Sequence, residues 1–253
     1  MKNYKITIQY DGTAYNGWQV QNNTDNTIQG KLEHILSRLS GEHIDVNGSG
    51  RTDAGVHAYG QVANFHMDSP DGQTSEDILL YINRYLPEDI AVTDIEEVDD
   101  RFHARLSAKS KTYRYRLQVS PIADPFSKRY VYTYLDAPLD IDAMQKAAKL
   151  LIGEHDFRSF CGNKHMKKST VRTITDITID SVYDSHGVKE IAIDYTGDGF
   201  LQNMVRIITG TLIEVGTNRR TPESIADTLA ALDRAAAGYT APPQGLCLME
   251  VQY

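Results

Sequence analysis

The stretch IDVNGSGRTDAGVHAYGQVANFH, residues 44–66, places a glycine-rich loop between two strand-like segments. Residues 44–47 and 61–66 predict the two strands, because apolar and aromatic residues recur in them and turn-forming residues bound them. The loop between them contains Gly48, Gly50 and Gly55 around Arg51 and Asp53. Glycine lets a backbone take positive φ and approach a ligand closely. We therefore expect Asp53 to stand on a tight turn at the edge of a sheet.

Outward from this loop, the first hundred residues predict six elements in the order β-α-β-β-α-β. Residues 5–10 and 90–98 predict the first and last strands. Residues 27–39 predict a helix with an apolar stripe at helical spacing, and residues 75–86 predict a second helix that ends before Pro87. This order is typical of the ferredoxin-like arrangement, in which two helices cover an antiparallel sheet.

The remainder of the chain predicts a looser copy of the same unit. Strands are expected at residues 111–119 and 246–253, helices at 142–152, 201–215 and 224–231, and a hairpin of residues 173–182 and 188–195 that turns at 184–187. We predict an α+β fold of two ferredoxin-like (RRM-like) halves, residues 1–105 and 106–253. Their antiparallel sheets are expected to join around a central cleft.

Composition excludes several classes of protein. The 253 residues include 26 Lys and Arg, 34 Asp and Glu and 41% hydrophobic residues, and the formal net charge is −8. This apolar content is too high for a chain that is disordered throughout. The two cysteines, Cys161 and Cys247, form no C-x-x-C pair, which argues against a disulfide framework or a cysteine zinc site. The start has no apolar leader region, and no run of about 18 apolar residues occurs. The sequence therefore predicts a soluble protein of the reducing cytoplasm.

Charge is segregated along the chain. Residues 101–123, the first basic window, contain six basic residues and no acid, and residues 158–172, the second basic window, contain five basic residues and no acid. Residues 88–100 carry seven acids and no base. Most charge runs are solvated faces. Two windows without acids, the first interleaved with aromatic residues, nevertheless favour a phosphate-rich ligand.

Chemistry alone leaves the role of the glycine-rich loop open. A loop aspartate such as Asp53 most often accepts hydrogen bonds from nearby backbone amides in an Asx-turn, and this structural role is favoured over catalysis. The loop lacks the G-x-x-x-x-G-K-[ST] pattern of a phosphate-binding P-loop. The spacing of His57 and His66 provides no zinc-ligand geometry.

The nine residues GRTDAGVHA, 50–58, resemble the signature of the tRNA pseudouridine synthase A family. Further segments resemble this family in the expected order: YDG (10–12) with GWQ (17–19), FHAR (102–105) with YRY (113–115), GF (199–200) with MVR (204–206) and Gly210, and GL (245–246). The resemblance spans nearly the whole chain, and residues 164–168 are a stretch that does not map onto it. A nine-residue match is far more specific than a lone G-x-G-x-x-G.

The resemblance implies that the chain converts uridine to pseudouridine without a cofactor or metal. Asp53 corresponds to the family's nucleophilic aspartate, and covalent addition of a carboxylate can split one difficult step into two easier ones. Arg206 corresponds to a cation that keeps this carboxylate ionised in a water-poor pocket, where burial alone would raise its pKa.

Three further residues take a role from the resemblance. Tyr113 corresponds to a tyrosine that contacts the substrate, with a ring that can stack on uracil and a phenol that can transfer a proton. Arg51 is placed to fill the space left when the target base is extruded from the RNA, or to clamp the RNA backbone. Leu246 is implied as a wall of the pocket. Taken without the family, the ordinary roles of these residues are a core tyrosine, a phosphate-contacting arginine and a core leucine.

The resemblance also implies partners. Family members act on uridines at positions 38 to 40 of the anticodon stem-loop of tRNA, and they form homodimers that need no membrane. A non-catalytic RNA-binding protein with two RRM-like halves is the main alternative, although the RNP1 run of such modules is absent. A glycosidase would need a second carboxylate across a sugar, such as Asp11 or Asp198, and nothing in the spacing places either beside Asp53.

Overall fold

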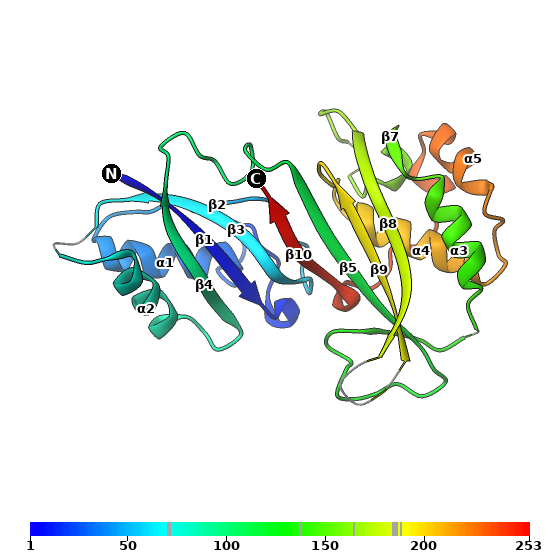
Figure 1. The fold of residues 1–253 in the computed structure, drawn as a ribbon, viewed down its shortest axis with the longest axis horizontal. Coiled ribbons are helices and arrows are strands. Elements are labelled where there is room, and N and C mark those ends of the chain that lie inside the picture. Colours follow the sequence, from blue (N-terminus) through cyan, green and yellow to red (C-terminus); the bar gives the residue numbers. More distant parts are fainter. Residues whose placement is uncertain (70–71, 137, 164, 184–186, 188) are drawn as a thin grey trace. The chain divides into compact units, whose positions relative to one another are not determined.

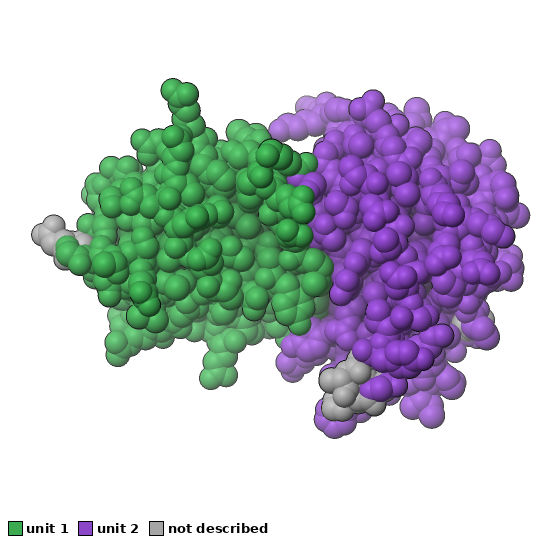
Figure 2. All heavy atoms as spheres, in the orientation of Figure 1, with its two compact units in different colours: residues 1–109, 247–253 green, residues 110–246 purple. Residues whose placement is uncertain are grey.

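The computed structural model describes residues 1–69, 72–136, 138–163, 165–183, 187 and 189–253. The chain divides into two compact units (Figure 2). Unit 1 comprises Met1–Lys109 and Cys247–Tyr253, and unit 2 comprises Ser110–Leu246. Of the expected hairpin turn, residues 184–186 lie outside the described residues, as does Lys164 of the stretch that the family pattern does not cover.

Unit 1 is an antiparallel sheet with two helices (Figure 1). Four strands lie in the order β4-β1-β3-β2, and a fifth, β10, pairs in parallel with the first residues of β3. The elements are β1 (Lys2–Tyr10), α1 (Ile28–Ser40), β2 (Asn47–Gly48), β3 (His57–Met67), α2 (Ser75–Tyr85), β4 (Ile90–Val98) and β10 (Leu246–Gln252).

Local sequence explains the elements of unit 1. Strand β1 is central because every second residue is apolar and buried: Tyr4, Ile6, Ile8 and Tyr10. Helix α1 begins at Thr27, whose side chain accepts from a backbone N–H, and ends at Gly41 in the left-handed conformation. Helix α2 begins with a capping box of Thr74 and Asp77, in which each side chain accepts from the other's backbone N–H.

Unit 2 contains mainly antiparallel strands and three helices (Figure 1). Its strands lie in the order β5-β9-β8-β7, and β6 pairs in parallel with β5. Helix α3 packs on α4 and on β8, and α4 is buried along most of its length because it is apolar on nearly all sides. The elements are β5 (Ser110–Val119), β6 (Tyr132–Tyr134), α3 (Ile141–Lys149), β7 (Gly153–Asp156), β8 (Val171–Tyr183), β9 (Lys189–Gly197), α4 (Met204–Gly216) and α5 (Ser224–Ala231).

The predicted α+β class is confirmed, with five α-helices in the part of the chain that the structure describes. The expected helices and strands are present with bounds that move by a few residues, except that only Asn47 of the strand expected at residues 44–47 lies in a strand. Strands β6 and β7 are not predicted, because three or four residues are too short for a periodic pattern to register. No helix within the described ranges has both the length and the apolar character needed to cross a membrane.

The last strand lies in a different unit from the half to which the sequence assigns it. Cys247 and Leu248 of β10 pair with His57 and Ala58 of β3. The Tyr253 hydroxyl donates to the Ala104 carbonyl at 2.7 Å, which ties the C-terminus to the same unit. Unit 1 also extends to Lys109 rather than to residue 105. A strand's partner far away in sequence leaves no local signal, so sequence patterns place β10 with its neighbours along the chain.

Candidate active site

The loop that carries Asp53, residues 48–57 and hereafter the Asp53 loop, is fixed through its backbone. The Thr52 carbonyl accepts from the Trp18 backbone N–H at 3.1 Å, and the Thr52 side chain bonds to the buried Tyr10 hydroxyl at 2.8 Å. The Asp53 carbonyl accepts from the Val56 N–H at 3.1 Å, which closes a tight turn. Asp53 therefore stands on a turn, as predicted, and its side chain is half-buried.

Two glycines outside the loop let a neighbouring segment approach it closely. A Cβ atom on Gly12 would lie 2.0 Å from the Val56 carbonyl oxygen, and a Cβ atom on Gly17 would lie 2.7 Å from the Thr52 carbonyl oxygen. Gly17 also has φ +91, a conformation that side chains rarely adopt. Residues 12–18 thus form a wall directly behind Asp53, and this wall requires glycine at both contacts.

The start of the Asp53 loop is held by buried polar groups. The Ser49 N–H donates to the Val62 carbonyl at 2.7 Å, and the Ser49 hydroxyl donates to the Gln61 side chain at 2.7 Å. The Gln61 amide in turn donates to the Gly50 carbonyl at 3.0 Å. Because buried polar groups are costly to leave without partners, these bonds define one conformation for the loop.

Arg51 is exposed, and a chain of amide side chains holds its guanidinium. Its Nε donates to the Gln19 side chain at 2.8 Å, and Gln19 donates to Gln29 at 2.7 Å. Gln29 donates to the Glu33 carboxylate at 2.7 Å. Within the described residues Arg51 has no carboxylate partner, so its charge is available for an anionic ligand.

Tyr113 lies in β5 of unit 2, opposite Tyr195 of β9. It is 7% exposed, and its ring meets the Phe200 ring edge to face, with centroids 5.3 Å apart. Tyr115, two residues along, is fully buried, and its hydroxyl donates to the Pro242 carbonyl at 2.8 Å. Burial also raises the pKa of Tyr115 well above that of a free phenol. The ring and hydroxyl of Tyr115 thus serve the packing of unit 2.

Arg206 lies in the first turn of α4, in a segment of residues 199–206 that we call the Arg206 turn. Its Nε donates to the Ala241 carbonyl at 2.8 Å, and one terminal nitrogen donates to the Asn203 side-chain oxygen at 2.9 Å. The Ala241 N–H returns a bond to the Arg206 carbonyl at 3.0 Å. Arg206 is half-buried although its helix neighbours are apolar. Two hydrogen bonds from the guanidinium thus fix the Arg206 side chain within unit 2.

Leu246 is the first residue of β10 and is 5% exposed. Just before it, Gly245 lies so close to the Tyr115 ring that a Cβ atom would come within 2.7 Å of it. The low exposure of Leu246 is that of a packed apolar residue, which agrees with the ordinary role of a core leucine. Unit 1 therefore holds Asp53 and Arg51, and unit 2 holds Tyr113, Arg206 and Leu246.

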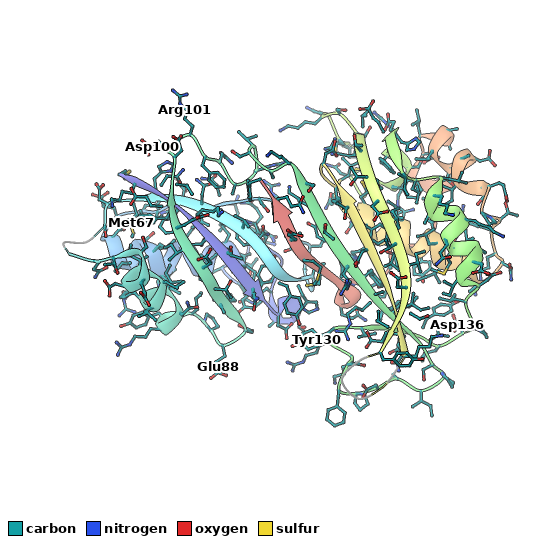
Figure 3. All side chains as sticks on the ribbon, viewed as in Figure 1. Met67, Glu88, Asp100, Arg101, Tyr130 and Asp136 are labelled. Carbon is teal, nitrogen blue, oxygen red and sulfur yellow. The ribbon has the colours of Figure 1, made fainter. Side chains whose placement is uncertain are left out.

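The two basic windows differ in structure. Arg114 of the first window forms two bonds of 2.7 Å with Asp194, and Arg116 forms bonds of 2.8 and 2.9 Å with Glu190. These cross-strand pairs neutralise two of the positive charges of the first window, which the sequence predicts to bind a phosphate-rich ligand. Arg101 of the same window is exposed and points away from the strands of unit 1 (Figure 3).

Three basic residues of the second window keep their charge open to solvent. Arg158, Lys167 and Lys168 are exposed, and no carboxylate partner for them occurs within the described ranges. The same ranges contain no group of three or more His, Cys, Asp or Glu side chains arranged to hold a metal ion. His57 instead lies beside the Gly12 N–H at 3.1 Å and the Asp11 carboxylate at 3.2 Å.

The sequence does not predict the contacts that three neighbouring residues make with the candidate site residues. Gln19 binds Arg51, Phe200 lies against Tyr113, and Asn203 binds Arg206. All three fall inside or beside segments that resemble the family, but a motif does not show which side chain touches which. An asparagine just before an apolar helix predicts a helix cap, which is not the use that Asn203 has here.

Comparison with known proteins agrees with the resemblance. The family model described as tRNA pseudouridine synthase matches residues 6–106 and 147–253. The chain is 47% identical to a tRNA pseudouridine synthase A of Bacillus sp. strain KSM-64, 46% identical to one of Brevibacillus brevis, and 44% identical to a tRNA pseudouridine synthase A 2 of Bacillus cereus strain ZK / E33L. Each match covers 100% of this chain and 100% of the relative.

A solved structure of an unknown protein from Galdieria sulphuraria aligns with 78% of this chain and 81% of that chain, with 8% identity and a TM-score of 0.22. The family model covers most of unit 1 and of unit 2, and the relatives match over the full length. The chain therefore belongs to the tRNA pseudouridine synthase family.

Proposed function

We propose that this chain isomerises uridine to pseudouridine in tRNA, at positions 38 to 40 of the anticodon stem-loop. The observation that carries the reaction is the full-length match to relatives named tRNA pseudouridine synthase A. The local geometry supports the assignment of Asp53, because its turn is fixed by bonds on both sides while its side chain is half-buried. A preorganised carboxylate is what a nucleophilic mechanism requires.

The reaction breaks the bond between N1 of uracil and C1′ of the ribose and forms a bond between C5 and C1′. We propose that the Asp53 carboxylate adds covalently to the substrate, so that the base detaches, turns and rejoins. The carboxylate is expelled from the substrate and the proton on C5 is released, which restores the free enzyme. N1 takes up a proton from solvent in place of the one that C5 releases, so the product is an isomer of the substrate and no electron transfer to another molecule is needed.

Arg206 is proposed to hold the Asp53 carboxylate in its charged form through the planar fork of its guanidinium. Support for this role within unit 2 is that bonds to Ala241 and Asn203 already fix the head group. Tyr113 is proposed to stack on the detached uracil, and Leu246 to form an apolar wall of the pocket.

Arg51 is proposed to occupy the space that the extruded base leaves, or to bind the adjacent phosphate. Its exposed guanidinium has no carboxylate partner in the described part of the chain, which suits an anionic or π-rich partner. Extrusion costs roughly a few kcal/mol, which contacts of this kind can offset. The second basic window is proposed to supply contacts with phosphates that do not depend on sequence.

The finer architecture and the assembly stay predictions. The resemblance implies two ferredoxin-like halves around a central cleft, a homodimer, and a cytoplasmic location. The strand order β4-β1-β3-β2 of unit 1, with helices between β1 and β2 and between β3 and β4, supports the ferredoxin-like description of that unit. Light scattering of the purified protein would test the dimer directly.

The function is tested with tRNA that carries tritium at C5 of its uridines. Formation of the C5–C1′ bond displaces this atom, so we expect tritium release, and mapping of the product should place pseudouridine at positions 38 to 40. Tight binding of tRNA without release would favour the non-catalytic RNA-binding protein. Release of free uracil would favour a glycosidase. Pseudouridine elsewhere in the tRNA would keep the reaction and overturn the anticodon assignment.

A further inference from the structure

We infer that Asn203 is a positioning residue for catalysis, which orients the Arg206 guanidinium through its side-chain oxygen. This inference rests on the proposed function, because it gives Asn203 a role only if Arg206 acts in the reaction. Three observations carry it: the backbone conformation of Asn203, the use of its side chain, and the packing that holds this side chain in place.

The backbone of Asn203 is in the left-handed region, with φ 59 and ψ 4. This conformation is uncommon for a residue other than glycine, although asparagine tolerates it better than most. Strained backbone of this kind is often found at functional sites, where the surrounding structure imposes it. Here it occurs directly before α4, three residues before Arg206.

The side chain of Asn203 does not perform its usual task at this position. An asparagine that precedes a helix commonly accepts a hydrogen bond from a backbone N–H of the first turn. Asn203 makes no such capping bond. Its oxygen instead accepts from a terminal nitrogen of Arg206 at 2.9 Å. The strained backbone therefore directs the amide to Arg206 and leaves the helix without that cap.

Neighbouring backbone holds the Asn203 side chain in this orientation. A Cβ atom on Gly162 would lie 2.6 Å from the Asn203 amide nitrogen and 3.2 Å from its Cβ, so the Gly162 backbone packs directly against the Asn203 side chain. The Gly162 N–H also donates to the Gln202 carbonyl at 2.8 Å. The segment before α4 is thus pinned from outside the helix, and the asparagine oxygen has a defined position.

A neutral oxygen suits this role. It accepts a charge-assisted hydrogen bond from Arg206 without cancelling the positive charge that the proposed mechanism directs to the Asp53 carboxylate. Together with the Ala241 carbonyl, it fixes both ends of the guanidinium plane. A guanidinium that keeps its charge but is no longer held in this orientation would stabilise the transition state less well.

The test compares two asparagines that both have positive φ. Asn218, near the other end of α4, has φ 58 and is exposed. Asn203→Gly and Asn218→Gly each allow positive φ without strain, so both variants should fold, and thermal melting checks this. Tritium release from uridine-labelled tRNA then gives kcat and KM. We expect Asn203→Gly to lower kcat about tenfold to a hundredfold with KM changed little, and Asn218→Gly to leave both unchanged.

Asn203→Asp provides the conservative variant. It keeps an oxygen acceptor and tolerance of positive φ but adds a negative charge beside Arg206, so its kcat should fall between those of Asn203→Gly and the parent protein. Equal kcat values for Asn203→Gly and Asn218→Gly, with pseudouridine still formed by the parent, would overturn the inference and leave the proposed function standing. If the parent protein forms no pseudouridine, the inference and the proposed function are both overturned.

Discussion

The Asp53 loop and the Arg206 turn hold their proposed site residues in opposite ways. In the Asp53 loop, bonds to the carbonyl groups of Thr52 and Asp53 fix the main chain. In the Arg206 turn, bonds to the guanidinium itself fix the side chain, through Ala241 and Asn203. A short side chain such as aspartate is placed well once its backbone is placed. Arginine has many more rotamers and needs restraint near its charged end.

This difference predicts which kinds of substitution each segment tolerates. The Asp53 loop should be sensitive to changes in packing at residues that lie against its backbone, such as Gly12. The Arg206 turn should be sensitive to loss of single polar atoms, with little change in stability. Measurements of activity and of unfolding free energy therefore separate the two.

The largest effect on the Arg206 turn is expected from Arg206→Ala. Removing a fixed charge that stabilises the reacting groups should lower the rate of pseudouridine formation about 1000-fold, with the fold retained. Tritium release under single-turnover conditions measures this. Arg219→Ala, an exposed arginine beyond the other end of α4, is the matched control and should keep the parent rate. Unchanged kinetics in Arg206→Ala would end the assignment of this residue.

For the Asp53 loop, Gly12→Ala should act through packing. The added Cβ would lie 2.0 Å from the Val56 carbonyl oxygen, so the wall behind Asp53 must move. We expect the free energy of unfolding to fall by about 3 kcal/mol, measured by urea denaturation. Gly41→Ala is the control, since that glycine has φ +79 with nothing within 4 Å, and it should lose about 1 kcal/mol. Equal losses of unfolding free energy at both positions would show that close packing behind Asp53 does not contribute to stability.

The smallest expected effect is on tRNA binding by the two basic windows. Replacing Lys167 and Lys168 together by alanine should reduce the slope of log K against log salt for tRNA binding by about 2, because each removes one phosphate contact. Arg114→Ala should change the slope less, since Asp194 already partners that guanidinium. Filter binding at several salt concentrations measures both slopes. The opposite ranking would place the RNA on the first window instead.

Sequence patterns predict the elements of this fold well and their long-range pairing poorly. The bounds of β4 (Ile90–Val98) and α5 (Ser224–Ala231) agree with those expected, because alternation, turn residues and helical spacing are local signals. The pairing of β10 with β3 joins residues nearly two hundred positions apart, and no local signal reports it. For the same reason, the division of the chain into units differs from the division expected.

For the candidate site, chemistry alone favours a structural role for Asp53, and the resemblance to a family reverses that interpretation. The hydrogen-bond partners of individual side chains are not predicted from the sequence. Nothing in the sequence shows that Arg114 and Arg116 face carboxylates on β9, because cross-strand partners depend on register. Nor does a motif reveal that Asn203 directs its amide to Arg206, since this depends on a positive φ that the sequence does not specify.

The central claim is that the Asp53 carboxylate initiates the isomerisation, and Asp53→Asn tests it most directly. The amide nearly matches the carboxylate in size but lacks its charge and nucleophilicity. With saturating variant over labelled tRNA in a single turnover, the account predicts no measurable release of tritium, while the affinity for tRNA stays within a few-fold of the parent protein. Pseudouridine formed at the parent rate by this variant would contradict the account.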